Sequence, residues 1–263
     1  MNGRKATRGH QKMGAAAFST IVLFALTSGA LAQILGTADS FAALGGSTVT
    51  NTGPTMLTGN LGVWPGTAIT GFPPGIVVGG TIHPGDGVAQ QAQVDLTVAY
   101  NIIAGEAFNA DLSGQDLGNR TLTPGVYRFG ASAPLNGTLI LDALGDPNAR
   151  FDFQIGSTFL VGSNSAVVMI NAGDACNVYW QVGSSATLGT TSAVLGHIMA
   201  LTSITMNTGA TILEGNALAR NGAVTMDTNT IAICDPVPEP ATFVAIGLGI
   251  AVAFARRLKR AVD

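Results

Sequence analysis

The stretch that decides the fold is FDFQIGSTFLVGSNSAVV at residues 151–168, because VYWQVGSSATLGTTSAVL at residues 178–195 aligns with it without a gap. A third unit begins near His197 and a fourth near Asn216, each about 18 to 20 residues long. Repetition at a fixed short period is typical of solenoid proteins. A unit of this length accommodates three short strands and three tight turns, so we predict that each unit forms one coil of a β-solenoid.

Polar and apolar residues alternate inside the units, which indicates the two sides of a strand. In the segments 185–189, 203–207 and 223–227, one parity is apolar and faces the core. The other parity is predicted to place three threonines on one outer face, Thr187, Thr205 and Thr225. Because stacked coils lie about 4.8 Å apart, these residues would form a flat ladder of hydroxyls and methyls. The turns that follow carry a second set, Thr190, Thr208 and Thr228, although Leu160 and Ser163 take the matching places in the earliest unit.

An N-terminal segment resembles the repeats in the second half of the chain. The segment NTGPTMLTGN at 51–60 matches NTGATILEGN at 207–216 at seven of ten positions. We therefore expect the N-terminal piece to form a coil of the same solenoid.

Between the two repeated regions the hydrophobic period changes to that of a helix. An apolar stripe runs through Val88, Ala92, Leu96, Ala99 and Ile103, and Asp86 is a suitable N-cap. The pattern predicts one helix at about 86–108, which would span about 30 Å and cover one flank of several coils. Its polar side has no Lys or Arg, which disfavours a helix lying on a membrane surface.

Charge is scarce and unevenly distributed. The chain has 263 residues, of which 47% are hydrophobic and 10% charged, so intrinsic disorder is excluded. Between Lys12 and Arg256 the only basic residues are four arginines, against 13 acidic residues from Asp39 to Asp235. This balance cannot neutralise a phosphate backbone, so nucleic acid is excluded as a partner.

Residues 1–32 have the three parts of a secretory signal peptide. A basic start is followed by a short apolar run and by Ala30-Leu31-Ala32, a small-residue cleavage site. The mature chain would begin near Gln33, and the alternative is a retained membrane anchor. Export would place the middle of the chain, 33–235, outside the cytoplasm.

The C-terminal end, 236–263, contains Val237-Pro238-Glu239-Pro240, an apolar stretch from Ala241 to Ala255, and a basic cluster at 256–260. This order resembles the PEP-CTERM sorting tail of Gram-negative bacteria. About 15 apolar residues make a short transmembrane helix whose basic flank stays in the cytoplasm. The resemblance implies an exosortase-type sorting enzyme as a partner, transient anchoring by this helix, and a final place at the cell surface or in the medium. An ordinary C-terminal anchor is the alternative.

The two cysteines and the histidines give no sign of a metal site. Cys176 and Cys234 would lie in an oxidising compartment, where a disulfide between them is possible. His83 and His197 are too isolated to complete a metal-ligand spacing. We expect no metal and no cofactor.

Several blocks stand in a fixed order along the chain: LTPGVY at 122–127, GTLILDA at 137–143, GDPNA at 145–149, FQIGS at 153–157, NVYWQVG at 177–183 and ALARNGAVT at 217–225. Together they resemble the ice-binding-like domain family of microbial antifreeze proteins. The resemblance covers about 36–234 and implies an all-β solenoid: a discontinuous right-handed β-helix of triangular cross-section, with N-terminal coils stacked on coils from the far end and one long α-helix alongside. It implies an ice crystal surface as the partner, and we expect a monomer without enzymatic activity.

Members of this family that bind ice use a flat face rich in Thr, Ser, Ala and Asn, often with a T-A/G-x-T/N pattern. Two segments fit this pattern, one from Thr208 to Thr211 and one from Thr52 to Thr55, which adds Thr211, Thr52 and Thr55 to the candidate ice-binding residues. The segments 190–193 and 228–231 depart from it. The ladder of Thr187, Thr205 and Thr225 is more regular.

Two other functions are weighed against ice binding. A solenoid enzyme acting on polysaccharide would need paired acid and base groups, but the acids mostly sit at turns and no lysine occurs in 33–235. The stronger alternative is a non-catalytic adhesion or structural protein of the cell surface or of an exopolysaccharide matrix, and Asp227 and Glu214 near the threonine rows favour it. We interpret Arg220 as structural and Trp180 as a stacking aromatic, in the core or in a groove.

Overall fold

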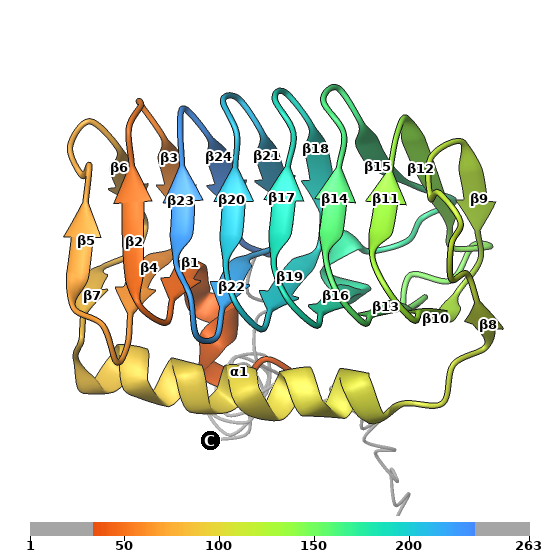
Figure 1. The fold of residues 1–263 in the computed structure, drawn as a ribbon, viewed down its shortest axis with the longest axis horizontal. Helices are drawn as coiled ribbons and strands as arrows, with labels where there is room; N and C mark the ends of the chain where they lie inside the picture. Colours follow the sequence, from red (N-terminus) through yellow and green to blue (C-terminus); the bar gives the residue numbers. More distant parts are fainter. Residues whose placement is uncertain (1–33, 235–263) are drawn as a thin grey trace, which may run out of the picture. The chain divides into compact units, whose positions relative to one another are not determined.

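In the computed structural model, which describes residues 34–234, the chain forms a three-sided β-solenoid with one long helix alongside (Figure 1). All strand pairs are parallel. Each complete coil contributes one strand to each of three sheets, which we name sheets A, B and C, and the coils at the two ends are incomplete. This arrangement confirms the all-β solenoid predicted from the repeats.

Sheet A faces the helix and has nine strands. In spatial order they are β7 (Ile82–Pro84), β4 (Asn60–Val63), β1 (Phe41–Gly45), β22 (Ala217–Ala219), β19 (His197–Ala200), β16 (Val178–Val182), β13 (Phe151–Ile155), β10 (Gly125–Phe129) and β8 (Ala110–Asp111).

Sheets B and C form the other two sides. Sheet B consists of β11 (Ala133–Leu135), β14 (Phe159–Val161), β17 (Ala186–Leu188), β20 (Ile204–Met206), β23 (Val224–Met226), β2 (Thr48–Asn51) and β5 (Ala68–Thr70). Sheet C consists of β6 (Ile76–Val78), β3 (Met56–Thr58), β24 (Thr230–Ala232), β21 (Thr211–Leu213), β18 (Ala193–Leu195), β15 (Ala166–Ile170), β12 (Thr138–Asp142) and β9 (Arg120–Leu122). Two short 3-10 helices, η1 (Gly36–Ser40) and η2 (Ala175–Asn177), lie beside sheet A.

The solenoid is discontinuous in sequence. The coil β1-β2-β3 stacks on β22-β23-β24, the last coil of the described chain, and β4-β5-β6 stacks outside it. Figure 1 shows this as red and orange strands beside blue ones. The predicted N-terminal coil is therefore confirmed.

Alternation and aromatic stacking build the interior. Inward-facing residues of the three sheets are almost fully buried, and Trp180 stacks on two phenylalanines of the neighbouring coil. Its ring centroid is 3.9 Å from that of Phe153 and 4.6 Å from that of Phe159, and its Nε1 donates to the Leu195 carbonyl. Trp180 therefore belongs to the core, which decides between the two places left open for it.

The helix α1 (Gly87–Gly105) lies along the coils, as predicted, and ends slightly earlier than expected (Figure 1). Asp86 caps it by accepting hydrogen bonds from the amides of Val88 and Ala89. The buried stripe runs through Ala89, Ala92, Leu96, Ala99 and Ile103. Val88 was wrongly assigned to this stripe: it is 49% exposed, because the first helical turn directs Ala89 rather than Val88 to the sheet.

Three polar side chains fasten α1 to sheet A in addition to this apolar stripe. Gln93 donates to the Ala219 carbonyl, Tyr100 to the Val182 carbonyl, and Gln154 of β13 to the carbonyls of Ile103 and Glu106. Arg220 lies over the Tyr100 ring at 4.6 Å. These contacts cover sheet A, so sheets B and C are the sheets left open to a large partner.

The predicted signal peptide (1–32) and the predicted transmembrane stretch (241–255) lie outside the described residues. Within 34–234, no helix combines the length and the apolar character needed to span a bilayer.

Candidate functional site

Five threonines lie in register on the outer side of sheet B and form what we call the threonine ladder. Thr187 pairs with Thr205, Thr205 with Thr225, Thr225 with Thr50, and Thr50 with Thr70. The first three were predicted from the repeats, and the structure places them side by side. Thr50 and Thr70 were missed, although both follow the same alternation in Thr48-Val49-Thr50 and in Ala68-Ile69-Thr70.

Strand alternation turns every ladder residue outward. The neighbours of Thr205, Ile204 and Met206, are buried at 0% and 1% exposure, and the equivalent residues of β17 and β23 are buried as well. None of the strand pairs that carry the ladder has a register shift, whereas β1 and β4 of sheet A shift between Phe41 and Ala43. Neighbouring ladder residues are therefore spaced by the strand separation, about 4.8 Å.

The corner that precedes the ladder is fixed by serine side chains. Ser185 Oγ accepts from the Ser203 amide of the next coil, and Ser203 Oγ accepts from the Ala223 amide. Because these hydroxyls bond to the backbone between coils, they hold the strands of sheet B in register. The serine hydroxyls are therefore used within the fold, and the threonines of the ladder provide the regular row of hydroxyls on this face.

At one end the ladder stops at β17, because the next two strands of sheet B, β14 and β11, have no threonine in the matching position. Leu160 of β14 stands in register with Thr187, and Pro134 of β11 stands in register with Leu160. Leu160 is 45% exposed, so the face continues as an apolar surface without hydroxyls.

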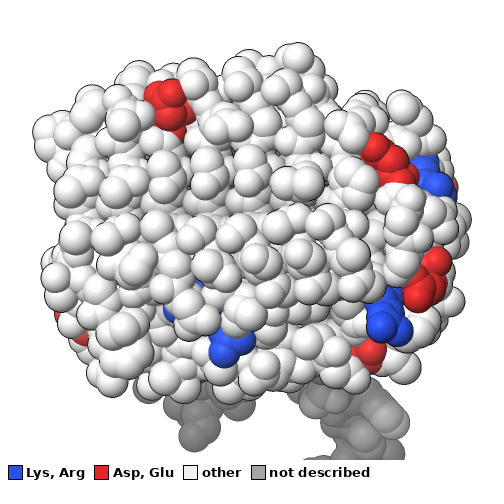
Figure 2. Space-filling model, in the orientation of Figure 1, with Lys and Arg blue, Asp and Glu red and all other residues white. Residues whose placement is uncertain are grey.

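The face of sheet B carries no charge. None of its seven strands contains Lys, Arg, Asp or Glu in the described part of the chain, and Figure 2 shows the broad white surface over these strands, with charged residues confined to its margins. One acid, Asp227, follows β23 at the corner with sheet C and accepts hydrogen bonds from Thr208 Oγ1 and Thr228 Oγ1. These bonds, with that from Thr208 the strongest, lower the pKa of Asp227.

The remaining candidate threonines lie elsewhere. Thr52, Thr190, Thr208 and Thr228 occupy exposed turns at the corner between sheets B and C. Thr211 lies on sheet C, in register with Ala193 and Thr230. Sheet C differs in chemistry because it exposes large apolar side chains, among them Met56, Ile76, Val78 and Leu213.

Thr55 requires a correction, because it is completely buried and cannot contact a crystal. Its hydroxyl donates to Asn51 Oδ1 and accepts from the Asn229 amide. The alignment of 51–60 on 207–216 paired Thr55 with Thr211, but β3 enters sheet C one residue later, so that Met56 pairs with Thr230 and hence aligns with Thr211. A one-residue offset in a strand reverses inside and outside.

The cysteines are joined in a disulfide between Cys176 and Cys234, which the sequence left open. His83 Nδ1 lies 2.8 Å from Asp86 Oδ2, beside the start of α1. In the described residues, no group of three or more His, Cys, Asp or Glu side chains could hold a metal ion.

A partly buried group of charges, of which only Asp152 is fully enclosed, lies at the other end of the helix, away from sheet B. Arg150 contacts Glu106 Oε1 at 2.7 Å and Asp152 Oδ2 at 2.9 Å. Burial raises the pKa of Asp152 to about 7, although the charge of Arg150 opposes this rise. The group fastens the end of α1 to β13, so we assign it a structural role.

The structure thus defines a parallel β-solenoid that presents the same uncharged threonine surface on five successive strands. Comparison with known proteins identifies the family: the chain belongs to the ice-binding-like family, whose profile matches residues 43–232. A second profile, the PEP-CTERM protein-sorting motif, matches residues 236–260.

Similar proteins are found both by sequence and by structure. An ice-binding protein of Nostoc sp. (strain HG1) is 55% identical over 87% of this chain and 88% of its own length. The crystal structure of an ice-binding protein from an Antarctic biological consortium is 48% identical, with a TM-score of 0.73 over 76% of this chain and 90% of that one. An ice-binding protein of Antarctomyces psychrotrophicus is 40% identical, also with a TM-score of 0.73, over 76% of this chain and 98% of that one.

Proposed function

We propose that this protein binds ice and restrains ice recrystallisation, with the threonine ladder of sheet B as the contact surface. The observation that carries the proposal is the register of Thr187, Thr205, Thr225, Thr50 and Thr70 across five adjacent strands. Membership of the ice-binding-like family supports it.

The chemistry of such a face suits adsorption to a crystal of water. Each threonine presents a methyl group and a hydroxyl at a spacing of about 4.8 Å, and the pairing of successive coils fixes this spacing. A rigid surface loses little conformational entropy when it adsorbs. Because the strands of sheet B carry no charged residue, water next to this face is ordered by hydroxyl and methyl groups. The function needs no bond-making step, so we propose no catalytic residue.

A matched pair of triple variants tests the proposal. Thr187, Thr205 and Thr225 are changed to Tyr in one variant, and Thr58, Thr211 and Thr230, which lie on the strands of sheet C, are changed to Tyr in the other. Inhibition of ice recrystallisation by the full chain is measured for both and for the wild type. We expect the sheet B variant to lose inhibition and the sheet C variant to keep it.

Two other outcomes would contradict the proposal. Equal loss in both variants would mean that sheet B has no special role. A folded wild-type protein without inhibition at micromolar concentration would favour a matrix or adhesion function, and binding to purified exopolysaccharide would then be the next measurement.

We further propose that the chain is exported and that an exosortase-type enzyme acts at its sorting tail. The sorting motif begins at residue 236, directly after the disulfide-bonded Cys234 that ends the described domain. Intact-mass measurement of the protein from cells and from medium tests this inference. A mature form that starts near Gln33 and ends near the motif is expected, and an uncut chain would contradict it.

A further inference from the structure

A pocket of about 440 Å³ lies beside α1, at the corner where sheet A leads into sheet B. Three segments contribute to its walls: Trp64 after β4, Arg220 and Asn221 after β22, and the middle of α1 with Val94 and Val98. None of the ladder threonines lines it. Ice adsorption on sheet B therefore does not explain this pocket.

The pocket lies where one coil contributes no side chain. In sheet A, β1 stands between β4 and β22, and it ends at Gly45. The register of both strand pairs places the next residue, Gly46, level with Trp64 and with Arg220. A Cβ atom at Gly46 would collide with the Arg220 carbonyl oxygen, so the close approach of the two backbones requires glycine. Trp64 and Arg220 therefore flank a position without a side chain.

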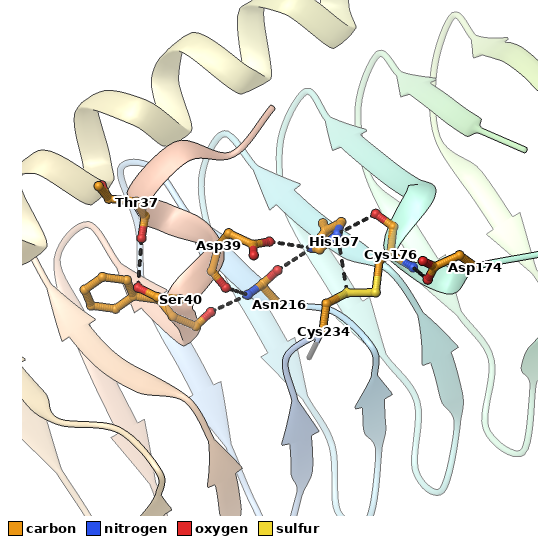
Figure 3. A network of polar contacts seen from close by, with 9 residues as sticks. Thr37, Asp39, Ser40, Asp174, Cys176, His197, Asn216 and Cys234 are labelled. Atoms are coloured by element: carbon orange, nitrogen blue, oxygen red, sulfur yellow. Dashed lines mark hydrogen bonds and ion pairs between the residues drawn. A yellow bond between two sulfur atoms is a disulfide. The ribbon is translucent and has the colours of Figure 1, made fainter. Parts of the chain in front are cut away.

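Other polar groups at this junction of coils find their partners inside the fold. Asn216, at the opposite end of β22, donates from Nδ2 to the carbonyls of Asp39 and Phe41 (Figure 3). Its Oδ1 faces the ring of His197, which also contacts the Cys176 carbonyl. The polar side chain that precedes β22 is thus fully used within the protein.

Arg220, which follows β22, has no such partners. Its guanidinium lies over the Tyr100 ring at 4.6 Å, and its Nε is buried without a hydrogen-bond partner. In the part of the chain that the structure describes, no carboxylate forms an ion pair with Arg220 and no acidic residue lines the pocket. A half-buried cation without a counterion is unfavourable, and a bound anion would offset this cost.

The remaining walls combine apolar surface with amide groups. Val94 and Val98 lie one helical turn apart on α1 and are 50% and 52% exposed, and Trp64 adds an aromatic surface. Gln93 donates one N–H to a backbone carbonyl of β22, which leaves its second N–H and its oxygen for a ligand. Asn221 adds a second, exposed amide. The pocket thus suits a ligand with an apolar face, several hydroxyls and one negative charge.

We propose that this pocket binds a sugar residue that carries a carboxylate, as in a polysaccharide that contains uronic acids. The C–H face of the sugar ring lies on Trp64 and the valines, and the hydroxyls bond the amides of Gln93 and Asn221. The carboxylate accepts two parallel N–H bonds from Arg220. The volume of the pocket is in the range of small-molecule sites and admits one such residue.

Calorimetry measures the affinity, and tryptophan fluorescence locates the ligand. The chain has two tryptophans, and Trp180 is fully buried in the core, so a ligand beside α1 changes the emission of Trp64. The full chain is titrated with a galacturonic acid trimer, with a neutral galactose trimer and with acetate. We expect the acidic trimer to bind at least about tenfold more tightly than the other two. No binding of the acidic trimer to folded protein, or equal affinity for the neutral trimer or for acetate, would overturn the proposal.

Two matched pairs of variants test the role of Arg220. Arg220→Gln removes the cation, and the control Arg128→Gln removes an exposed arginine that also lies over an aromatic ring, that of Phe108. Val98→Asp places a carboxylate at the pocket, and the control Ile102→Asp places one a helical turn away, outside it. We expect Arg220→Gln and Val98→Asp to weaken binding of the acidic trimer by about tenfold or more, and the controls to leave it unchanged. Equal weakening in the controls would indicate general charge attraction and would overturn the site.

The second pair remains usable if Arg220→Gln does not fold, because Val98 and Ile102 are both exposed on α1. Inhibition of ice recrystallisation is measured on the same variants and should stay at the wild-type level, because no ladder threonine lines the pocket. Failure of the sugar site and failure of the ice-binding face are therefore distinguishable.

Discussion

Asp152 predicts an unusual dependence of stability on pH. This carboxyl group is 2% exposed on β13, beside Arg150, and burial raises its pKa to about 7 against an ordinary value of 3.8. In the unfolded chain the group ionises near its ordinary value, so the folded state binds more protons between these two values. The free energy of unfolding must therefore fall as pH rises through this window.

The size of the effect follows from the two pKa values. A separation from 3.8 to about 7 corresponds in full to about 4 kcal/mol, of which about 3 kcal/mol falls between pH 5 and pH 8. An Asp152→Asn variant keeps the shape of the side chain but cannot ionise. Its stability relative to the wild type should therefore grow by about 3 kcal/mol from pH 5 to pH 8.

The assay is urea unfolding of the full chain at pH 5, 6, 7 and 8, with the wild type and Asp152→Asn measured together. Taking the difference between them removes the contributions that both proteins share. A difference that stays constant across this range, or that moves the other way, would refute the assignment of a raised pKa to Asp152.

Three further changes test the packing. Trp180→Ala should lower the free energy of unfolding by about 3–5 kcal/mol, because the ring is fully buried and stacks on two phenylalanines, and a loss below 1 kcal/mol in a denaturant titration would contradict that packing. The Cys176–Cys234 disulfide closes a span of 58 residues, so its reduction should lower the free energy of unfolding by about 4 kcal/mol through loop entropy. Reductant should therefore lower the Tm of the wild type and leave the Tm of a Cys176→Ser/Cys234→Ser control unchanged. Thr55→Val should lower the free energy of unfolding by about 1–3 kcal/mol, because it leaves Asn51 Oδ1 and the Asn229 amide unpaired. Inhibition of recrystallisation should persist, and its loss in a folded variant would contradict the buried position of Thr55.

The repeat and the alternation were enough to predict the architecture. Strand alternation depends only on parity, so the aligned units at 151–168 and 178–195 have the register that their alignment implies. The helix was equally readable, because Asp86 and a stripe of period 3.6 mark it. The prediction was wrong at Val88, in the first turn, because the capping residue Asp86 and not the apolar stripe determines where the helix begins.

The candidate face could be predicted only in part, because the sequence does not show which strands of distant coils pair and in which register. Thr50 and Thr70 belong to coils that precede the helix in sequence but stack on the last coil in space, so local repetition could not add them to the ladder. Thr55 was misplaced because sequence identity to 207–216 was highest in an alignment offset by one residue from the strand pairing. Asn51 and Asn229 are buried in this corner, and their side chains donate hydrogen bonds to backbone carbonyls there. These bonds stabilise the shifted backbone, and residue spacing alone does not predict them.

The central claim is that one uninterrupted ladder, assembled from both ends of the domain, contacts ice. Thr50 tests it most directly, because it belongs to the N-terminal coil and pairs with both Thr225 and Thr70. Thermal hysteresis of the full chain is measured for the wild type, for Thr50→Tyr and for Thr58→Tyr, the last being an exposed strand threonine on sheet C. The account predicts that Thr50→Tyr loses most of the hysteresis while Thr58→Tyr keeps it; full activity of a folded Thr50→Tyr variant would contradict a single ladder.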